Sequence, residues 1–313
     1  MTTPDTKTAD TPKHVIAHFS DTHFLADNAP LYGEIPTLDN LVSALDRLEK
    51  SGKPVEAIVF TGDLTDLAEP DAYQRLRRNV EPVAARLGAE IIWVMGNHDE
   101  RFRFATQLLD MPVTDAPQDR VIRLGGLRII ALDSTVPGYH HGELDDGQLD
   151  WLAAELATPA PDGTLLALHH PPLRTPIKLM QLIELKGRDR LADVIRNTDV
   201  RGILGGHLHY ATHSTLAGIP VSVAAATCYT IDVAAPAGAL SSVDGGQAFN
   251  LVELYDDSVV HSVVPMTGYR EVAEIPQAMV DAFEQLTPDE QFEAFSNKKS
   301  YFDETGIHIG GAI

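Results

Sequence analysis

Five short segments of the sequence gather aspartate, asparagine and histidine in patterns that suit the binding of metal ions. They read DTH, GDLTD, GNHD, HH and GHLH, and each lies at the end of an apolar run. Ionisable groups at the end of a buried strand are costly unless something binds them. The segments supply Asp21, His23, Asp63, Asp66, Asn97, His98, Asp99, His169, His170, His207 and His209.

Imidazole, carboxylate and amide ligands together predict a transition-metal site. This mixture suits Mn, Fe, Zn or Co and is too rich in nitrogen for Ca or Mg to fit best. The candidates are too numerous for one ion of ordinary coordination, and they suffice for two ions that share one carboxylate. Asp63 is the best shared ligand, because Gly62 before it lets the backbone approach the ions. In DTH and HLH we expect an extended backbone to point both paired residues the same way.

Strands must carry these segments to a common place. Continuous Val, Ile and Leu content predicts strands that are buried on both faces, at residues 14–20, 57–63, 90–97, 128–134, 164–170 and 201–207. Helical spacing of leucines recurs between them, at residues 38–50, 71–88, 145–157 and 188–197. Ligands of open α/β sheets bind outside the carboxyl ends of the strands. We therefore expect the polar residues to meet at one such edge.

The pattern changes after Gly218, where strand-like runs follow one another without long helices. These runs cover 219–227, 247–255 and 258–266, and antiparallel pairing is expected for them. The predicted fold class is therefore α/β with a β-rich second half. We expect a disordered leader over 1–13, a catalytic domain over 14–269, and a helical appendage over 270–313 that packs on the core or on a partner subunit.

Composition limits the classes of partner. The chain has 313 residues and a formal net charge of −21, so it repels nucleic acid over most of its surface. Its one cysteine, Cys228, cannot form an internal disulfide, which makes the cytoplasm the default compartment. We find no apolar stretch long enough for a transmembrane segment and no signal peptide.

In their order along the chain, the five segments resemble the calcineurin-like binuclear metallophosphoesterases, whose pattern is D-x-H, G-D-x-x-D, G-N-H-D/E, H and G-H-x-H. Each element is weak alone, and the ordered set is highly specific. Within that family the sequence is most similar to the class III cyclic nucleotide phosphodiesterases of bacteria, through FSDTHF, IVFTGDL, WVMGNHD, LALHHPP and GHLHY. The resemblance implies a four-layer αββα sandwich of two mixed β-sheets flanked by helices.

The resemblance also implies roles for individual residues. One metal ion would be held by Asp21, His23, Asp63 and His209, and the second by Asp63, Asn97, His169 and His207. Two divalent or trivalent transition ions are implied, with Fe and Mn favoured and Zn or Co as alternatives. His98 would lie near the scissile phosphate without binding a metal, and Asp66 would orient it. Residues expected to contact substrate are Asn97, His98 and His140.

The implied reaction is hydrolysis of 3′,5′-cyclic nucleotides, cAMP or cGMP, to 5′-monophosphates by a metal-bridging hydroxide. The alternative is a promiscuous metallophosphoesterase that acts on other phosphodiesters, pyrophosphates or monoesters. A non-catalytic scaffold would have broken ligand positions, and none is broken. The resemblance and the apolar C-terminal residues favour a homodimer.

Several other residues are left with open interpretations. His140 and His141 lie in a loop, where one of them borders the substrate pocket or both are solvated. His170 is expected behind the ligands or in the core, and Cys228 is expected to be a buried small residue. His213, His261 and His308 have no partner visible in the sequence and are expected at the surface.

Overall fold

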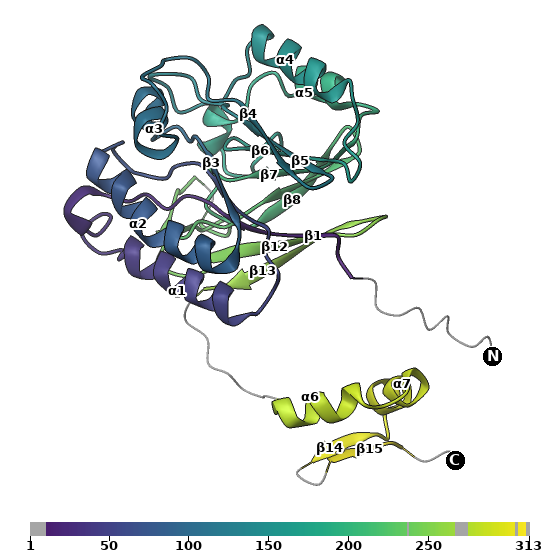
Figure 1. Cartoon of the computed structure of the whole chain (residues 1–313). Coiled ribbons are helices and arrows are strands. Elements are labelled where there is room, and N and C mark those ends of the chain that lie inside the picture. The colour runs from purple at the N-terminus through teal and green to yellow at the C-terminus, as the bar shows by residue number, and fades with distance from the viewer. Residues whose placement is uncertain (1–10, 237, 267–274, 304–305, 311–313) are drawn as a thin grey trace. The chain divides into compact units, whose positions relative to one another are not determined.

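The computed structural model describes two compact units of the chain, one within residues 12–267 and one made of the described residues that follow (Figure 1). The residues that it describes are 11–236, 238–266, 275–303 and 306–310. Most of the predicted leader, and residues 270–274 of the predicted appendage, lie outside this set. Among the described residues, none of the helices combines the length and apolarity needed to cross a bilayer.

The first sheet has five strands in the order β13-β12-β1-β2-β3, of which β1, β2 and β3 run parallel to one another. Its strands are β1 (His14–Phe19), β2 (Ala57–Thr61), β3 (Glu90–Val94), β12 (Ala248–Leu254) and β13 (Val259–Pro265). Helices α1 (Thr37–Lys50) and α2 (Pro70–Leu87) cover its outer face, because their apolar stripes pack on residues such as Phe19 and Phe60. Phe19 pairs with Phe60, so the first two strands end at one level.

The second sheet has six strands in the order β4-β5-β6-β7-β9-β8. They are β4 (Arg120–Leu124), β5 (Leu127–Leu132), β6 (Thr164–Leu168), β7 (Val200–Gly205), β8 (Thr212–Leu216) and β9 (Ile219–Val223). Neighbours among β5, β6, β7 and β9 are parallel, and the edge strands β4 and β8 are antiparallel to theirs. Helices α4 (Asp146–Leu156) and α5 (Arg188–Ile195) pack on its outer face.

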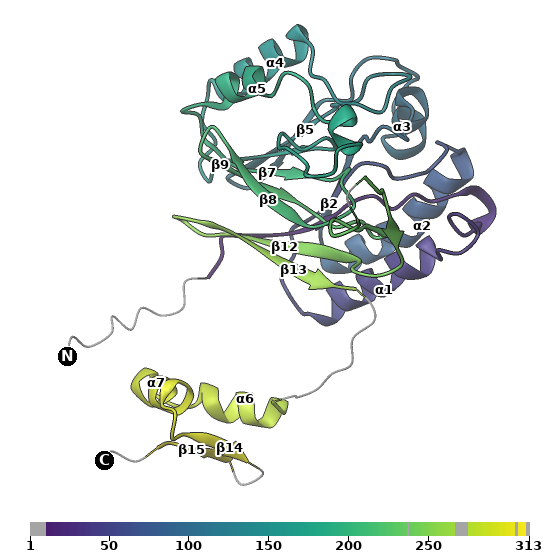
Figure 2. The same ribbon diagram turned by 180° about the vertical axis from the view of Figure 1, so that it is seen from behind.

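The two sheets face each other across an apolar layer. Ile16, Val59 and Ile92 of the first sheet lie in one cluster with Ile129 and Leu165 of the second. The view from behind shows α1 and α2 on one side of the sheets and α4 and α5 on the other (Figure 2). The predicted four-layer αββα sandwich is confirmed, and the central strands β1, β2, β5 and β6 are mostly apolar because each buries both faces.

Several elements differ from the sequence prediction. The strands that precede the polar segments end earlier than predicted, with β2 ending at Thr61, because the last residues of each run form loops. Strand β9 was expected to pair only antiparallel, yet it lies parallel to β7 and antiparallel to β8. Elements that the periodicity did not reveal are α3 (Arg101–Leu108), β4, β8 and the short segments η1 (Ala26–Asn28), η2 (Met180–Ile183), β10 (Thr230–Ile231) and β11 (Ser242–Val243).

The second compact unit contains a β-hairpin in addition to helices. Its elements are α6 (Gln277–Glu284), α7 (Pro288–Ser296), β14 (Tyr301–Asp303) and β15 (Gly306–His308). Thr287 and Glu290 form a capping box at the start of α7. The ring centres of Phe283 and Phe295 lie 5.8 Å apart, so part of the apolar surface of this unit is covered from within.

Candidate metal centre

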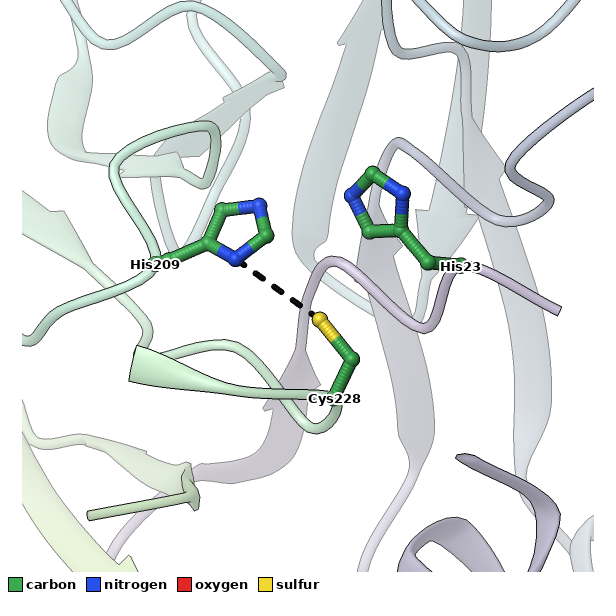
Figure 3. Close-up of side chains that lie close together, drawn as sticks. All are labelled: His23, His209 and Cys228. Atoms are coloured by element: carbon green, nitrogen blue, oxygen red, sulfur yellow. Dashed lines mark hydrogen bonds between the residues drawn. The ribbon is translucent and has the colours of Figure 1, made fainter. Parts of the chain in front are cut away.

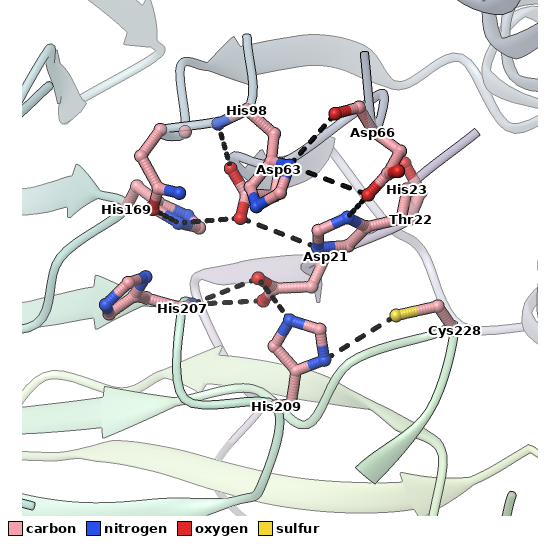
Figure 4. Close-up of polar contacts among 12 residues, drawn as sticks. Asp21, Thr22, His23, Asp63, Asp66, His98, His169, His207, His209 and Cys228 are labelled. Carbon is pink, nitrogen blue, oxygen red and sulfur yellow. Dashed lines mark hydrogen bonds and ion pairs between the residues drawn. The ribbon is translucent and has the colours of Figure 1, made fainter. Parts of the chain in front are cut away.

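Loops at the carboxyl ends of strands from both sheets bring the polar segments together. DTH follows β1, GDLTD follows β2 and GNHD follows β3 of the first sheet, while HH follows β6 and GHLH follows β7 of the second. The predicted meeting of five segments is present, but two facing sheets build it rather than the edge of one. Figure 4 shows their side chains converging between the loops.

The backbone is left-handed at five of the seven candidate ligand residues, so DTH and HLH are not extended as predicted. The φ angles are 53° at Asp21, 45° at His23, 48° at Asp63, 68° at His207 and 59° at His209. Such angles are strained for residues other than glycine and persist only where the surroundings impose them. Hydrogen bonds from the amides of Asp21 and His23 to the carbonyl oxygens of Gly62 and Asp63 help to impose them here.

One consequence is that the two histidines of GHLH serve different clusters. His209 joins Asp21, His23 and Asp63, and one ligand atom from each of the four lies within 4.8 Å of the others. His207 instead groups with the two histidines of the HH segment, His169 and His170.

In the first cluster, each imidazole has one ring nitrogen held and the other directed at the carboxylates. Nδ1 of His23 lies 2.9 Å from Asp66 Oδ1, and its Nε2 lies 3.5 Å from Asp63 Oδ2. Nδ1 of His209 donates to the carbonyl oxygen of Tyr229 at 3.2 Å, and its Nε2 lies 3.4 Å from Asp21 Oδ1. Partners of this kind orient imidazoles that bind metals.

His169 of the second cluster also faces the carboxylate of Asp63. Nε2 of His169 lies 3.3 Å from Asp63 Oδ2 and 3.2 Å from Asn97 Oδ1, while its Nδ1 donates to the carbonyl oxygen of Thr61. Nε2 of His207 donates to the carbonyl oxygen of Ile183 at 3.0 Å, which leaves Nδ1 as the ring nitrogen that could bind a metal ion. The same oxygen of Asp63 therefore faces His23 on one side and His169 on the other.

Two glycines allow this close approach around Asp63. A Cβ atom at Gly62, whose φ is 92°, would lie 2.5 Å from His169 Nδ1. A Cβ atom at Gly96 would lie 2.0 Å from the Asp63 amide nitrogen and 2.2 Å from its Oδ1. The loops after β2 and β3 thus touch backbone to backbone beneath the shared carboxylate.

We expect the Gly96→Ala variant to have a lower metal content and to be less stable by about 1–3 kcal/mol, the usual effect of overpacking. The added methyl group can be accommodated only if Asp63 moves, and that movement separates the shared carboxylate from His169. Elemental analysis and thermal unfolding test this. Gly245→Ala is the control, because a Cβ atom there meets nothing within 4 Å. Wild-type metal content and unfolding temperature in Gly96→Ala would contradict the expectation.

His98 and Asp66 are arranged differently from the expectation. The carboxylate of Asp66 lies closer to His23, at 2.9 Å, than to Nδ1 of His98, at 3.5 Å. It is the carbonyl oxygen of Asp66, at 2.9 Å, that accepts a hydrogen bond from His98 Nδ1. The main-chain amide of His98 donates to Asp63 Oδ1 at 2.8 Å. Asp66 therefore orients two histidines, one with each of its polar groups.

A cavity of about 720 Å³ opens beside the clusters, and Asn97, His98 and His140 line it. Nδ1 of His140 lies 3.0 Å from Asn97 Nδ2, and the ring centres of His98 and His140 are 5.5 Å apart. The structure thus brings the three residues expected to contact substrate to one surface.

Cys228 lies beside the first cluster and is fully buried. Its Sγ is 3.6 Å from Nδ1 of His209 (Figure 3), on the side of the ring away from Asp21 (Figure 4). Burial raises the pKa of this thiol well above its ordinary value. Cys228 is a buried small residue, as expected, and together with His23 and His209 it also forms a further group of side chains that could hold a metal ion.

His170 and His261 lie in different surroundings within the fold. Both ring nitrogens of His170 make hydrogen bonds, to Ser134 Oγ and to the carbonyl oxygen of His140, which puts this residue behind the ligands. His261 was expected at the surface, but it is half-buried in β13, and its ring nitrogens have no hydrogen-bond partner among the described residues. The reason is strand alternation, since His261 pairs with the inward-facing Val252.

Asp99 is a structural residue whose role the sequence analysis missed. Its buried carboxylate accepts hydrogen bonds from the amides of Gly96, Leu64 and Thr65 and from the hydroxyl of Tyr73. It thereby joins the loop after β3 to the loop after β2. Its position directly after His98 was the available signal, but the partners come from distant segments.

The charges in the clusters are strongly coupled. Burial alone would lower the pKa of His169, but the carboxylates of Asp63 and Asp21 outweigh it and raise the pKa to about 9. Burial alone would raise the pKa of Asp63, but the imidazoles of His169, His98 and His23 hold it well below its usual range. Burial lowers the pKa of His207 and of His209 well below the ordinary value.

The side chains of the two clusters are suited to binding metal ions, and contacts among themselves do not satisfy all of their polar atoms. Two buried carboxylates, Asp21 and Asp63, face four buried imidazoles, and Nε2 of His23 has no hydrogen-bond partner within the described part of the chain. Carboxylate and imidazole are ligands that transition metals accept together. A cation between them would compensate the buried negative charge and use the unpartnered nitrogen.

Two clusters of imidazoles around one carboxylate, at the carboxyl ends of strands in an αββα sandwich, define a dimetal phosphoesterase. Residues 14–211 match the calcineurin-like phosphoesterase family, and the chain belongs to this family. Its members bind two metal ions.

Curated relatives of the chain are named as cyclic nucleotide phosphodiesterases. A cAMP/cGMP dual specificity phosphodiesterase of Mycobacterium tuberculosis is 54% identical over 82% of this chain and 81% of its own length. A 3′,5′-cyclic adenosine monophosphate phosphodiesterase of Pseudomonas aeruginosa is 28% identical over 82% of this chain and 95% of its own length. The likeness therefore extends over most of each protein.

Solved structures share the fold at low identity. A dimetal phosphatase from Danio rerio superposes with a TM-score of 0.60 at 16% identity, covering 82% of this chain and 97% of its own. A purple acid phosphatase from yellow lupin reaches 0.59 at 14% identity, covering 81% of this chain and 51% of its own.

Proposed function

We propose that this protein hydrolyses 3′,5′-cyclic nucleotides, cAMP and cGMP, to 5′-monophosphates. The observation that carries the proposal is the single oxygen of Asp63 that faces His23 at 3.5 Å and His169 at 3.3 Å. The name of the M. tuberculosis relative, at 54% identity, supports the choice of substrate. So does the cavity beside the clusters, which has the volume of a small-molecule site.

In this proposal the ligand set is the one implied by the sequence. Asp21, His23, Asp63 and His209 would hold one ion, and Asp63, Asn97, His169 and His207 would hold the other. The donor set supports a transition-metal pair, for which we propose Fe and Mn, with Zn or Co as alternatives. When bound, such ions supply an activated water and neutralise the oxygens of the phosphate.

His98 is proposed to act on the leaving oxygen. The carbonyl oxygen of Asp66 can only accept, so the 2.9 Å contact requires a proton on His98 Nδ1. Nε2 is then the nitrogen that is left to exchange a proton with the substrate. The ring can therefore donate from Nε2 to the 3′ oxygen as the ester bond breaks.

Asn97 and His140 are proposed to orient the substrate. The amide of Asn97 directs its oxygen toward His169 and its nitrogen toward His140, so one side chain lies between the metal ligands and the cavity. His140 is exposed, in a loop, and can adjust to a bound phosphoester.

The proposal predicts the ranking of substrates. We expect the metal-loaded enzyme to convert cAMP to 5′-AMP with a higher kcat/KM than it shows for p-nitrophenyl phosphate, a monoester with a better leaving group. Chromatographic product analysis would verify the 5′ product, and 2′,3′-cyclic nucleotides would complete the panel. Faster turnover of the monoester would favour the alternative, a promiscuous phosphoesterase acting on other phosphate esters.

A cytoplasmic homodimer is also part of the proposal. The single buried cysteine is consistent with a reducing compartment. Exposed aromatic residues of the second unit, Phe292 and Phe295, offer apolar surface for a second copy. Sedimentation of the protein at the mass of one chain would reject the dimer.

A further inference from the structure

The cavity beside the metal centre has an apolar wall, and the proposed reaction at phosphorus does not involve these apolar residues. Leu67, Phe102 and Tyr139 line it, and they remain 62%, 38% and 63% exposed. They come from three separate places, the loop after β2, the first turn of α3 and the loop after β5. Isolated exposed apolar residues are ordinary, whereas several around one cavity mark a binding surface.

Each of the two aromatic rings has one side chain packed against it. The guanidinium of Arg103 lies over the Phe102 ring, 5.3 Å from its centre. The ring of His141 lies 5.3 Å from that of Tyr139. Such support fixes the orientation of a ring before a ligand arrives, which reduces the entropy lost on binding.

The charges around the cavity argue against a second anionic group in the ligand. Among its described lining residues there is one arginine and no lysine. That arginine, Arg101, donates to the carboxylate of Asp133 and to the carbonyl oxygens of Asp115 and Thr135. Glu100 and Asp115 add negative charge to the lining. The part of the ligand that lies away from the metal centre is therefore uncharged.

From these features we propose that the cavity holds the base of a cyclic nucleotide, with Leu67, Phe102 and Tyr139 packing against its faces. The inference rests on the proposed function and adds the subsite that holds the base. Asn97 and His98 line the same cavity and connect it with the metal centre, so phosphate and base can be bound together. Stacking on aromatic side chains tolerates different bases, so adenine and guanine are both accepted.

The test compares substrates with and without a base. The probes are cAMP and its abasic analogue, in which a hydrogen atom replaces adenine. We expect Phe102→Ala and Tyr139→Ala each to raise KM for cAMP about tenfold, the usual effect of losing one stacking partner. KM for the abasic analogue and kcat for cAMP stay near the wild-type values, because uniform binding affects KM alone.

Two further variants serve as controls. Phe102→Tyr retains the flat ring, so its KM for cAMP should be close to the wild-type value. Val42→Ala shortens an aliphatic side chain that is 44% exposed on α1 and should change neither substrate. The base subsite is rejected if Phe102→Ala and Tyr139→Ala leave the KM for cAMP unchanged, or if they raise KM equally for cAMP and the abasic analogue. Either result would leave the phosphodiesterase activity standing.

A binding measurement separates this inference from the proposed function. Calorimetric titration of the metal-loaded protein with 5′-AMP and with ribose 5-phosphate does not depend on turnover. If wild type fails to hydrolyse cAMP but binds 5′-AMP about tenfold more tightly than ribose 5-phosphate, and Phe102→Ala removes the difference, the subsite stands and the proposed reaction fails. Equal affinity of wild type for the two ligands rejects the subsite.

Discussion

The Asp63→Ala variant is expected to lose both metal ions and to reduce kcat/KM for cAMP by at least about a thousandfold, since metal binding and activation of water fail together. The reason is geometric. Oδ2 of Asp63 faces imidazoles of both clusters, and Oδ1 accepts the amide hydrogen of His98. Elemental analysis of the purified protein and steady-state kinetics measure the two effects.

Two variants isolate the role of the Asp63 charge. Asp63→Asn keeps the side-chain volume and an oxygen for the His98 amide, so it should fold and still bind less metal. Asp199→Ala is the control, because Asp199 is a mostly buried carboxylate paired with Arg128 at the opposite ends of the strands. It should lose stability but keep two ions. Retention of full metal content by Asp63→Ala would reject the shared ligand.

The His98→Ala variant is expected to retain both ions and to lose about a hundredfold or more in kcat for cAMP, the scale of general acid catalysis. The side chain of His98 is 31% exposed, and His98 is absent from the group of Asp21, His23, Asp63 and His209. Its removal should therefore spare the ligands. Metal analysis and kinetics on the same sample test both statements.

The choice of leaving group distinguishes a proton donor from a merely structural residue. The sugar 3′ oxygen of cAMP needs a proton as it leaves, whereas p-nitrophenolate does not. We expect His98→Ala to lose much less activity on bis-p-nitrophenyl phosphate than on cAMP. His213→Ala, in an exposed position on β8, controls for the loss of a histidine. Equal losses on the two substrates would remove the assigned proton transfer.

Much of the site could be predicted because its information is local. The types of the candidate ligands and their order along the chain are properties of the sequence. The apolar runs before them predict the strands, and the loops at the carboxyl ends of those strands carry the candidate ligands. Asp66 contacts His98, as the resemblance implied, and also contacts a second histidine. Its carboxylate was expected on His98, but it lies closer to His23, since the path of the loop decides which atom of one residue faces which ring.

By itself, the sequence determined the six central strands, the four helices around them and the ligand types, because periodicity and residue chemistry act over a few neighbours. Only the tertiary structure decided that loops of two sheets build the candidate site and that five of the seven candidate ligand residues are left-handed. The physical reason is that strained backbone angles persist only where contacts from distant segments impose them, and such contacts have no local signal.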